Sequence, residues 1–165
     1  MKLMNAAFEP TRAPCDWLSR DKKEVDAFMN DPLCFPSLTA RSTRSFLNAS
    51  ARLANPGELQ KVRGDLPIYL FSGSNDPVGQ RLAGVRQLID RYRGAGIVSI
   101  THDFYLRGRH EMLHELNRRH VTSNLLNWIS GIVTGHPESS ESRGKTLDAA
   151  ITLLFQWCGS LARRE

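Results

Sequence analysis

The spacing of apolar residues changes near the middle of the chain. In the first 60 residues, apolar side chains recur at helical intervals, which predicts a short helix over residues 22–30 and a longer one over 38–54. Asp21 precedes the first helix and Glu24 follows three positions later, a pattern that resembles a capping box. Pro10 and Pro14 predict an extended lead-in over residues 1–14, before these two helices.

Two compact apolar runs follow, at residues 66–71 and 97–106, and each leads into a turn that contains glycine. The first run is typical of a strand buried on both faces of a sheet. Amphipathic helices are predicted over residues 79–93 and 121–129. The order strand–helix–strand–helix indicates an α/β fold in which the two strands are parallel.

The pattern changes again after the last of these helices. Residues 134–146 are polar and predict a linker, and the apolar spacing over 147–161 predicts a further amphipathic helix. We therefore expect a helical segment over 1–60, an α/β unit over 61–133, the linker, and a carboxyl-terminal helix within 147–165.

Composition excludes several classes of protein. The chain has 165 residues, enough for one modest domain, and its net charge of +5 is dispersed, so we expect no nucleic-acid partner. No apolar stretch approaches the roughly 18 residues of a membrane span, and the first residues lack the apolar run of a signal peptide, so we expect a cytoplasmic protein. The three cysteines form no CxxC pair, which gives no sign of a zinc knuckle or a disulfide framework.

One ionisable residue follows each predicted strand: Asp76 lies in the turn after the first, and His110 in the loop after the second. The carboxyl ends of parallel strands gather functional side chains at one edge of a sheet. A carboxylate held against an imidazole fixes the tautomer of the ring and stabilises its protonated form. Asp76 and His110 are therefore candidates for the second and third members of a Ser–Asp–His order. Taken singly, each residue also fits an ordinary surface or capping role.

The joint context is more specific. The string SGSNDPVG after a strand, a helix with GVRQLIDRYRGAG, and a strand ending in FYLRGRHEML together resemble the carboxyl-terminal part of an α/β-hydrolase. The resemblance is to the lysophospholipase and monoacylglycerol-lipase-like branch, also described as serine aminopeptidase-like. The stretch FEPTRAPCDWLSRDKKEVDAFMNDPLC is similar to the lid that this branch inserts before its last two strands. The resemblance covers residues 8–130. It implies a partial α/β-hydrolase fold: the lid helices plus the last two parallel strand–helix units, with residues 147–161 as an extra helix.

The resemblance also implies a chemistry. The expected reaction is hydrolysis of a carboxylic ester, such as a monoacylglycerol or lysophospholipid, with Asp76 orienting His110 and His110 acting as general base and then general acid. No metal or organic cofactor is required. The lid would ordinarily set the acyl-chain preference, although core packing is the alternative role for its apolar residues Trp17, Leu18, Phe28, Met29, Leu33 and Phe35.

The chain departs from the family at the nucleophile. The family serine lies in a GxSxG elbow upstream of the lid, and no such string occurs here; residues 131–135, GIVTG, have Val133 at the serine position. We therefore expect a truncated serine hydrolase that is inactive as an isolated chain. The first strand would have an unpaired edge, at which the chain could self-associate.

Two other classes remain open. Residues 110–120 satisfy HExxHxxNxxH, in which His110, His114 and His120 could hold a zinc ion and Glu111 could activate its water, as in a metalloprotease. Two features argue against a zinc site. Gly108 and a strand come just before this motif, whereas in zinc proteases the motif lies within a helix that extends on both sides of it. In addition, no methionine follows His120, so the methionine turn of these proteases cannot form. The third class is a non-catalytic remnant that acts as a binding module.

Overall fold

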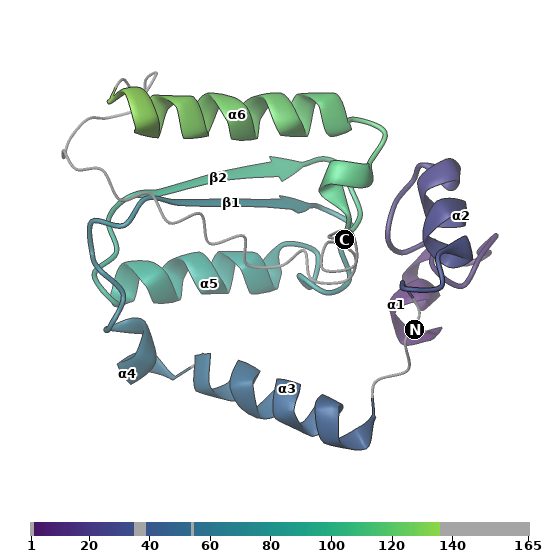
Figure 1. Cartoon of the computed structure of the whole chain (residues 1–165), viewed down its shortest axis with the longest axis horizontal. Helices are drawn as coiled ribbons and strands as arrows, with labels where there is room; N and C mark the ends of the chain where they lie inside the picture. Colours follow the sequence, from purple (N-terminus) through teal and green to yellow (C-terminus); the bar gives the residue numbers. More distant parts are fainter. Residues whose placement is uncertain (1, 35–38, 54, 136–165) are drawn as a thin grey trace.

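The computed structural model describes residues 2–34, 39–53 and 55–135 (Figure 1). Strands β1 (Ile68–Gly73) and β2 (Ile100–Tyr105) pair in parallel, and within these residues they form the whole sheet. Helix α5 (Ala83–Gly94) lies on one side of the sheet and α6 (Arg118–Thr134) on the other. The predicted α/β class and the parallel pairing are confirmed. The helix predicted over 147–161, and nearly all of the linker before it, lie outside the described residues.

The core lies mainly against β1, most of whose residues are buried. Ile68 and Leu70 pack against Val85 and Ile89 of α5. A smaller cluster on the α6 side of the sheet consists of Tyr105, Met112 and Val121. β2 is more exposed than β1: only its last residue, Tyr105, is buried, and Thr101 and His102 are exposed.

Several element boundaries differ from the prediction: β2 covers 100–105 instead of 97–106, and α6 covers 118–134 instead of 121–129. β1 begins at Ile68, not at residue 66, because Pro67 has no N–H to donate to the ladder. Helix α5 begins at Ala83, four residues later than expected. The intervening residues Gln80, Arg81 and Leu82 all have left-handed backbone angles, with φ of 52°, 50° and 77°. Three consecutive non-glycine residues in this region carry no sequence signal and are costly, so the surrounding turn must hold them there.

The cap segment, residues 2–34, lies at the carboxyl ends of the strands (Figure 1). It comprises α1 (Lys2–Asn5), the 3₁₀ turn η1 (Ala6–Phe8) and α2 (Lys22–Asn30). The extended lead-in predicted over residues 1–14 is therefore wrong for residues 2–8. The cap segment has a small core of its own, formed by Ala13, Cys15, Trp17, Leu18 and Val25.

Helix α2 has half of the predicted capping box. The Asp21 carboxylate accepts a hydrogen bond from the Lys23 N–H at 3.1 Å, as an N-cap should. Glu24 does not complete the box, because its carboxylate contacts His114 instead. The residue that would have closed a local motif therefore makes a long-range contact.

Helices α3 (Ala40–Leu53) and α4 (Pro56–Leu59) lead from the cap segment to β1. Residues 40–52 of α3 are exposed, with Arg41, Arg44 and Arg52 on this helix. Within the described part of the chain, no helix has both the length and the hydropathy that a membrane crossing requires.

Candidate active site

The acid of the candidate pair is fixed by the turn that follows β1. The backbone N–H of Asp76 donates to the carbonyl of Gly73 at 3.1 Å, and the Asp76 carbonyl accepts from the N–H of Arg81 at 2.8 Å. Its Oδ1 accepts from the N–H of Val78 at 2.9 Å. These contacts hold the carboxylate in one orientation, and it is almost completely buried. The strained turn that delays α5 thus serves to hold Asp76.

The imidazole comes from the loop after β2. His110 Nδ1 lies 3.1 Å from Asp76 Oδ1, and both side chains are buried. An ionised carboxylate can only accept, so with Asp76 ionised this contact places the ring proton on Nδ1 and leaves Nε2 with its lone pair. This is the arrangement in which an imidazole can take a proton from a nucleophile. The structure therefore brings together the two residues that the sequence selected, 34 positions apart.

Two glycines allow this approach. A Cβ on Gly73 would lie 2.2 Å from both the carbonyl carbon and the oxygen of Gly108, so only glycine fits at residue 73. The Gly108 carbonyl accepts from the N–H of Asn75 at 2.8 Å, which ties the second loop to the first. The turn that carries the acid and the loop that carries the base are thus in direct backbone contact.

The cap segment covers the pair. The ring of Trp17 lies against that of His110, with ring centroids 5.1 Å apart. The backbone N–H of His110 donates to the Trp17 carbonyl at 3.4 Å. The next N–H, of Glu111, donates to the carbonyl of Leu18 at 2.7 Å. The cap segment therefore contributes both a ring contact and two backbone acceptors to the loop that carries the base.

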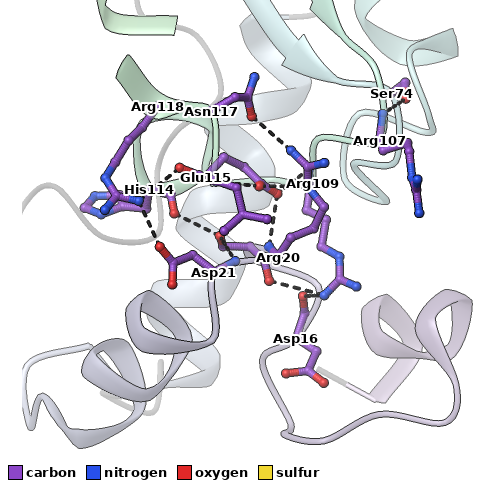
Figure 2. Close-up of polar contacts among 12 residues, drawn as sticks. Asp16, Arg20, Asp21, Ser74, Arg107, Arg109, His114, Glu115, Asn117 and Arg118 are labelled. Carbon is purple, nitrogen blue, oxygen red and sulfur yellow. Dashed lines mark hydrogen bonds and ion pairs between the residues drawn. The ribbon is translucent and has the colours of Figure 1, made fainter. Parts of the chain in front are cut away.

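A buried carboxylate fastens these two regions together (Figure 2). Glu115 is fully buried, and its Oε1 accepts from the N–H groups of Arg20, at 3.1 Å, and Arg109, at 3.0 Å. Its Oε2 accepts from Arg20 Nε and from the N–H of Leu116, each at 2.9 Å. Four donors satisfy the two oxygens, so the burial of this charge is compensated.

Arg109 and Arg118 add further links between the same regions. The Arg109 guanidinium donates to the carbonyls of Asp16 and Ser19, and burial lowers its pKa. Arg118 donates to Asp21 Oδ2 at 2.9 Å, and this bond lowers the pKa of Asp21 (Figure 2). The basic residues near the His110 loop therefore hold the cap segment in place.

Several of these residues were not singled out from the sequence. Glu115 and Arg20 stand in segments without apolar periodicity, where a charged residue is ordinarily exposed. Trp17 was identified only as a lid residue that could line an acyl-chain site. It and Leu18 are buried in the core of the cap segment, whereas Met29 and Leu33 are exposed. Phe35 lies outside the described residues.

The remaining site hypotheses find no support in the geometry. Ser74, the serine nearest Asp76 in the sequence, uses its Oγ to accept from the N–H of Arg107 at 2.8 Å (Figure 2). The HExxH string is not helical: His110 lies in a bend, Glu111 has no regular secondary structure, and a 3₁₀ turn covers only Met112–His114. His114 Nδ1 contacts Glu24 at 2.9 Å, and His120 lies edge-on to the ring of Tyr105. Among the described residues, no group of three or more His, Cys, Asp or Glu side chains could hold a metal ion.

The fold and the site define the class of the protein. A buried carboxylate and a histidine follow adjacent parallel strands of an α/β sheet, and a helical segment covers them, which is typical of α/β-hydrolases. The family model described as serine aminopeptidase, S33, matches residues 2–117. The chain therefore belongs to this α/β-hydrolase family, and the resemblance identified in the sequence is confirmed at this level. No curated protein and no solved structure matches the chain significantly.

Proposed function

We propose that this chain supplies the acid, the base and the lid of a serine esterase, with Asp76 orienting His110 and His110 transferring the proton. The observation that carries the proposal is the buried contact of 3.1 Å between His110 Nδ1 and Asp76 Oδ1. It leaves Nε2 as the basic atom, which is the role of the histidine in acyl transfer through a serine.

The nucleophile must come from outside these 165 residues, because they contain no GxSxG string. We infer that the chain alone does not turn over esters. Removing one member of a triad leaves only weak residual catalysis, and the backbone donors of the oxyanion hole also belong to the segments that precede the lid in this family.

The proposed substrates are carboxylic esters of lipids, such as monoacylglycerols or lysophospholipids. Two features support this proposal: membership of an α/β-hydrolase family and the apolar cap segment over the pair. The ring of Trp17 beside His110 makes the surroundings of the base apolar, which suits an acyl chain better than a charged group.

Complementation tests the proposal. The chain is co-expressed with the amino-terminal part of an active member of the same family, from its first strand through the GxSxG elbow, and hydrolysis of a p-nitrophenyl ester is measured. We expect turnover by the complex, none by the chain alone, and a loss of about a thousandfold or more for His110→Ala or Asp76→Asn. The matched control His114→Ala alters a half-exposed histidine of the same loop and should retain the activity.

Two outcomes would contradict the proposal. One is steady turnover by the isolated chain; the other is a complex whose activity is unaffected by His110→Ala. Gel filtration must first show that the two parts associate, so that a failure to assemble is not mistaken for a failure of the chemistry.

The open edge of β1 provides a second candidate function, as a binding module. Within the described residues β1 pairs with β2 only, so its other edge carries unpaired backbone groups on an otherwise buried strand. Such an edge is a template for a further strand, which supports self-association through β1. Sedimentation of the chain over a hundredfold range of concentration tests this function; a monomer at every concentration excludes it.

A further inference from the structure

A small cavity lies between the cap segment and the residues that follow His110. Its volume is about 30 Å³, enough for one or two groups of the size of water. Apolar side chains line part of it, and its polar lining includes two carboxylates and one imidazole. The lining residues are Leu18, Ser19, Glu24, Val25, Phe28, Cys34, Glu111 and His114.

Glu111 is buried beside this cavity, and one of its two carboxylate oxygens has no partner among the described residues. The residue is 8% exposed, and its Oε1 has no hydrogen-bond partner among the described residues. Its backbone is held at both ends: the N–H donates to the Leu18 carbonyl at 2.7 Å, and the carbonyl accepts from the N–H of His114 at 2.9 Å. The side chain therefore cannot leave the cavity without moving the loop that carries His110.

The histidine and arginine side chains nearby are already engaged with other carboxylates. His114 Nδ1 lies 2.9 Å from Glu24 Oε2, and Arg118 lies 3.9 Å from Glu24 Oε1. Arg20 is paired with Glu115 at 2.9 Å. Within the described residues, Glu111 Oε1 is therefore left without a donor, which is costly for a buried polar atom.

We propose that this cavity binds a small ammonium group, with Glu111 as its principal acceptor. The volume admits a group of one or two heavy atoms and excludes a bulky cation. An ammonium group needs only hydrogen-bond acceptors and an opposite charge, both of which Glu111 provides. A metal ion fits less well, because the described residues offer no set of three or more ligands. The site is separate from the Asp76–His110 pair and does not depend on the proposed esterase function.

Titration with methylammonium chloride at constant ionic strength tests the site. The readouts are the ¹³C shift of the Glu111 carboxyl group and the melting temperature of the full chain. We expect a saturable shift and a rise in melting temperature with the wild-type chain, and an affinity at least about tenfold lower with Glu111→Gln, which keeps the shape and removes the charge. The matched control Glu58→Gln alters an exposed carboxylate on α4 and should bind like the wild type.

Two further ligands separate charge from donor geometry. Tetramethylammonium has the same charge without N–H donors, and methanol has a similar size without charge. An equal response to either, or binding that is unchanged in Glu111→Gln, overturns the proposal. So does a crystal structure at saturating methylammonium that shows an ordered water only at Glu111 Oε1. If Glu111→Gln does not fold, the wild-type titration still decides, because the absence of a saturable carboxyl shift overturns the proposal.

Discussion

The indole ring of Trp17 covers the imidazole of His110, with ring centroids 5.1 Å apart and planes inclined by 38°. The two residues are 93 positions apart, one in the cap segment and one in the loop after β2. Both are buried, and the indole N–H of Trp17 has no hydrogen-bond partner among the described residues. Trp17 therefore acts here as an apolar cover for the candidate base.

This contact predicts losses of stability of very different size for two substitutions of Trp17. Trp17→Phe keeps most of the ring and removes the unpaired N–H, so it should cost less than about 1 kcal/mol of the free energy of unfolding. Trp17→Ala leaves a cavity over His110 and should cost about 3–5 kcal/mol. Urea unfolding of both variants measures the difference. Equal costs would show that the ring does not pack as described.

A second prediction concerns the approach of the two turns. Gly73→Ala would place a Cβ at 2.2 Å from backbone atoms of Gly108, a contact that only a backbone shift can relieve. We expect a loss of about 2–4 kcal/mol, together with a changed NMR environment of His110. Gly94→Ala is the control, because a Cβ there meets nothing within 4 Å and the position lies in the last turn of α5. It should be neutral or slightly stabilising. Similar losses from both changes would contradict the packing of the two turns.

Glu115 should dominate the attachment of the cap segment to the loop. Glu115→Gln retains the volume of the side chain but removes its negative charge. That charge compensates Arg20, and the carboxylate oxygens also accept hydrogen bonds from three backbone N–H groups. Breaking a buried pair on one side costs on the order of 3 kcal/mol, whereas Glu58→Gln, in the exposed pair with Lys61, should cost less than about 1 kcal/mol. Chemical unfolding measures both, and increased proteolysis between residues 20 and 40 would locate the effect of Glu115→Gln in the cap segment.

The ion pair between Asp21 and Arg118 predicts a pH dependence. The bond from Arg118 lowers the pKa of Asp21 below the value of 3.8 that applies in the unfolded chain. Just below pH 3.8 the unfolded chain therefore binds more protons, so stability rises with pH in this window. The contribution is complete above pH 3.8 and is lost as the pH falls through the lower pKa of the folded state.

Asp21→Asn tests this dependence, because asparagine still caps α2 but does not titrate. The stability of the variant should fall below that of the wild type at pH 7, and the two should converge toward pH 2. The measurement is a series of urea midpoints across this range. If the difference in stability between the wild type and Asp21→Asn stays constant with pH, the effect comes from the N-cap of α2 alone and not from the ion pair with Arg118.

The sequence predicted the α/β class, the parallel pairing and the approximate extent of α2, α3 and α6 because each depends on local periodicity. It also selected Asp76 and His110, since both follow a recognisable strand and turn. It could not predict the left-handed residues 80–82, because their conformation is imposed by the turn around Asp76 and not by their side chains. Nor could it identify Glu115, and its prediction that Glu24 completes a capping box is wrong. Glu24 and Glu115 both bind residues about 90 or more positions away, and only the tertiary fold brings such partners together.

The pairing of Asp76 with His110 predicts a fixed tautomer in the chain as it stands, without a nucleophile or a substrate. Asp76 Oδ1 accepts a hydrogen bond from His110 Nδ1, so the neutral ring should carry its proton on Nδ1. The ¹⁵N spectrum of His110 should therefore show an unprotonated Nε2. Asp76→Asn exchanges the carboxylate for a group that can also donate, so the fixed preference for Nδ1–H should be lost while the fold is retained. His102, on β2 and exposed, provides an internal control whose spectrum should not change. A wild-type ring with its proton on Nε2 would show that Asp76 does not orient His110, and the proposed proton transfer would then lack its basis.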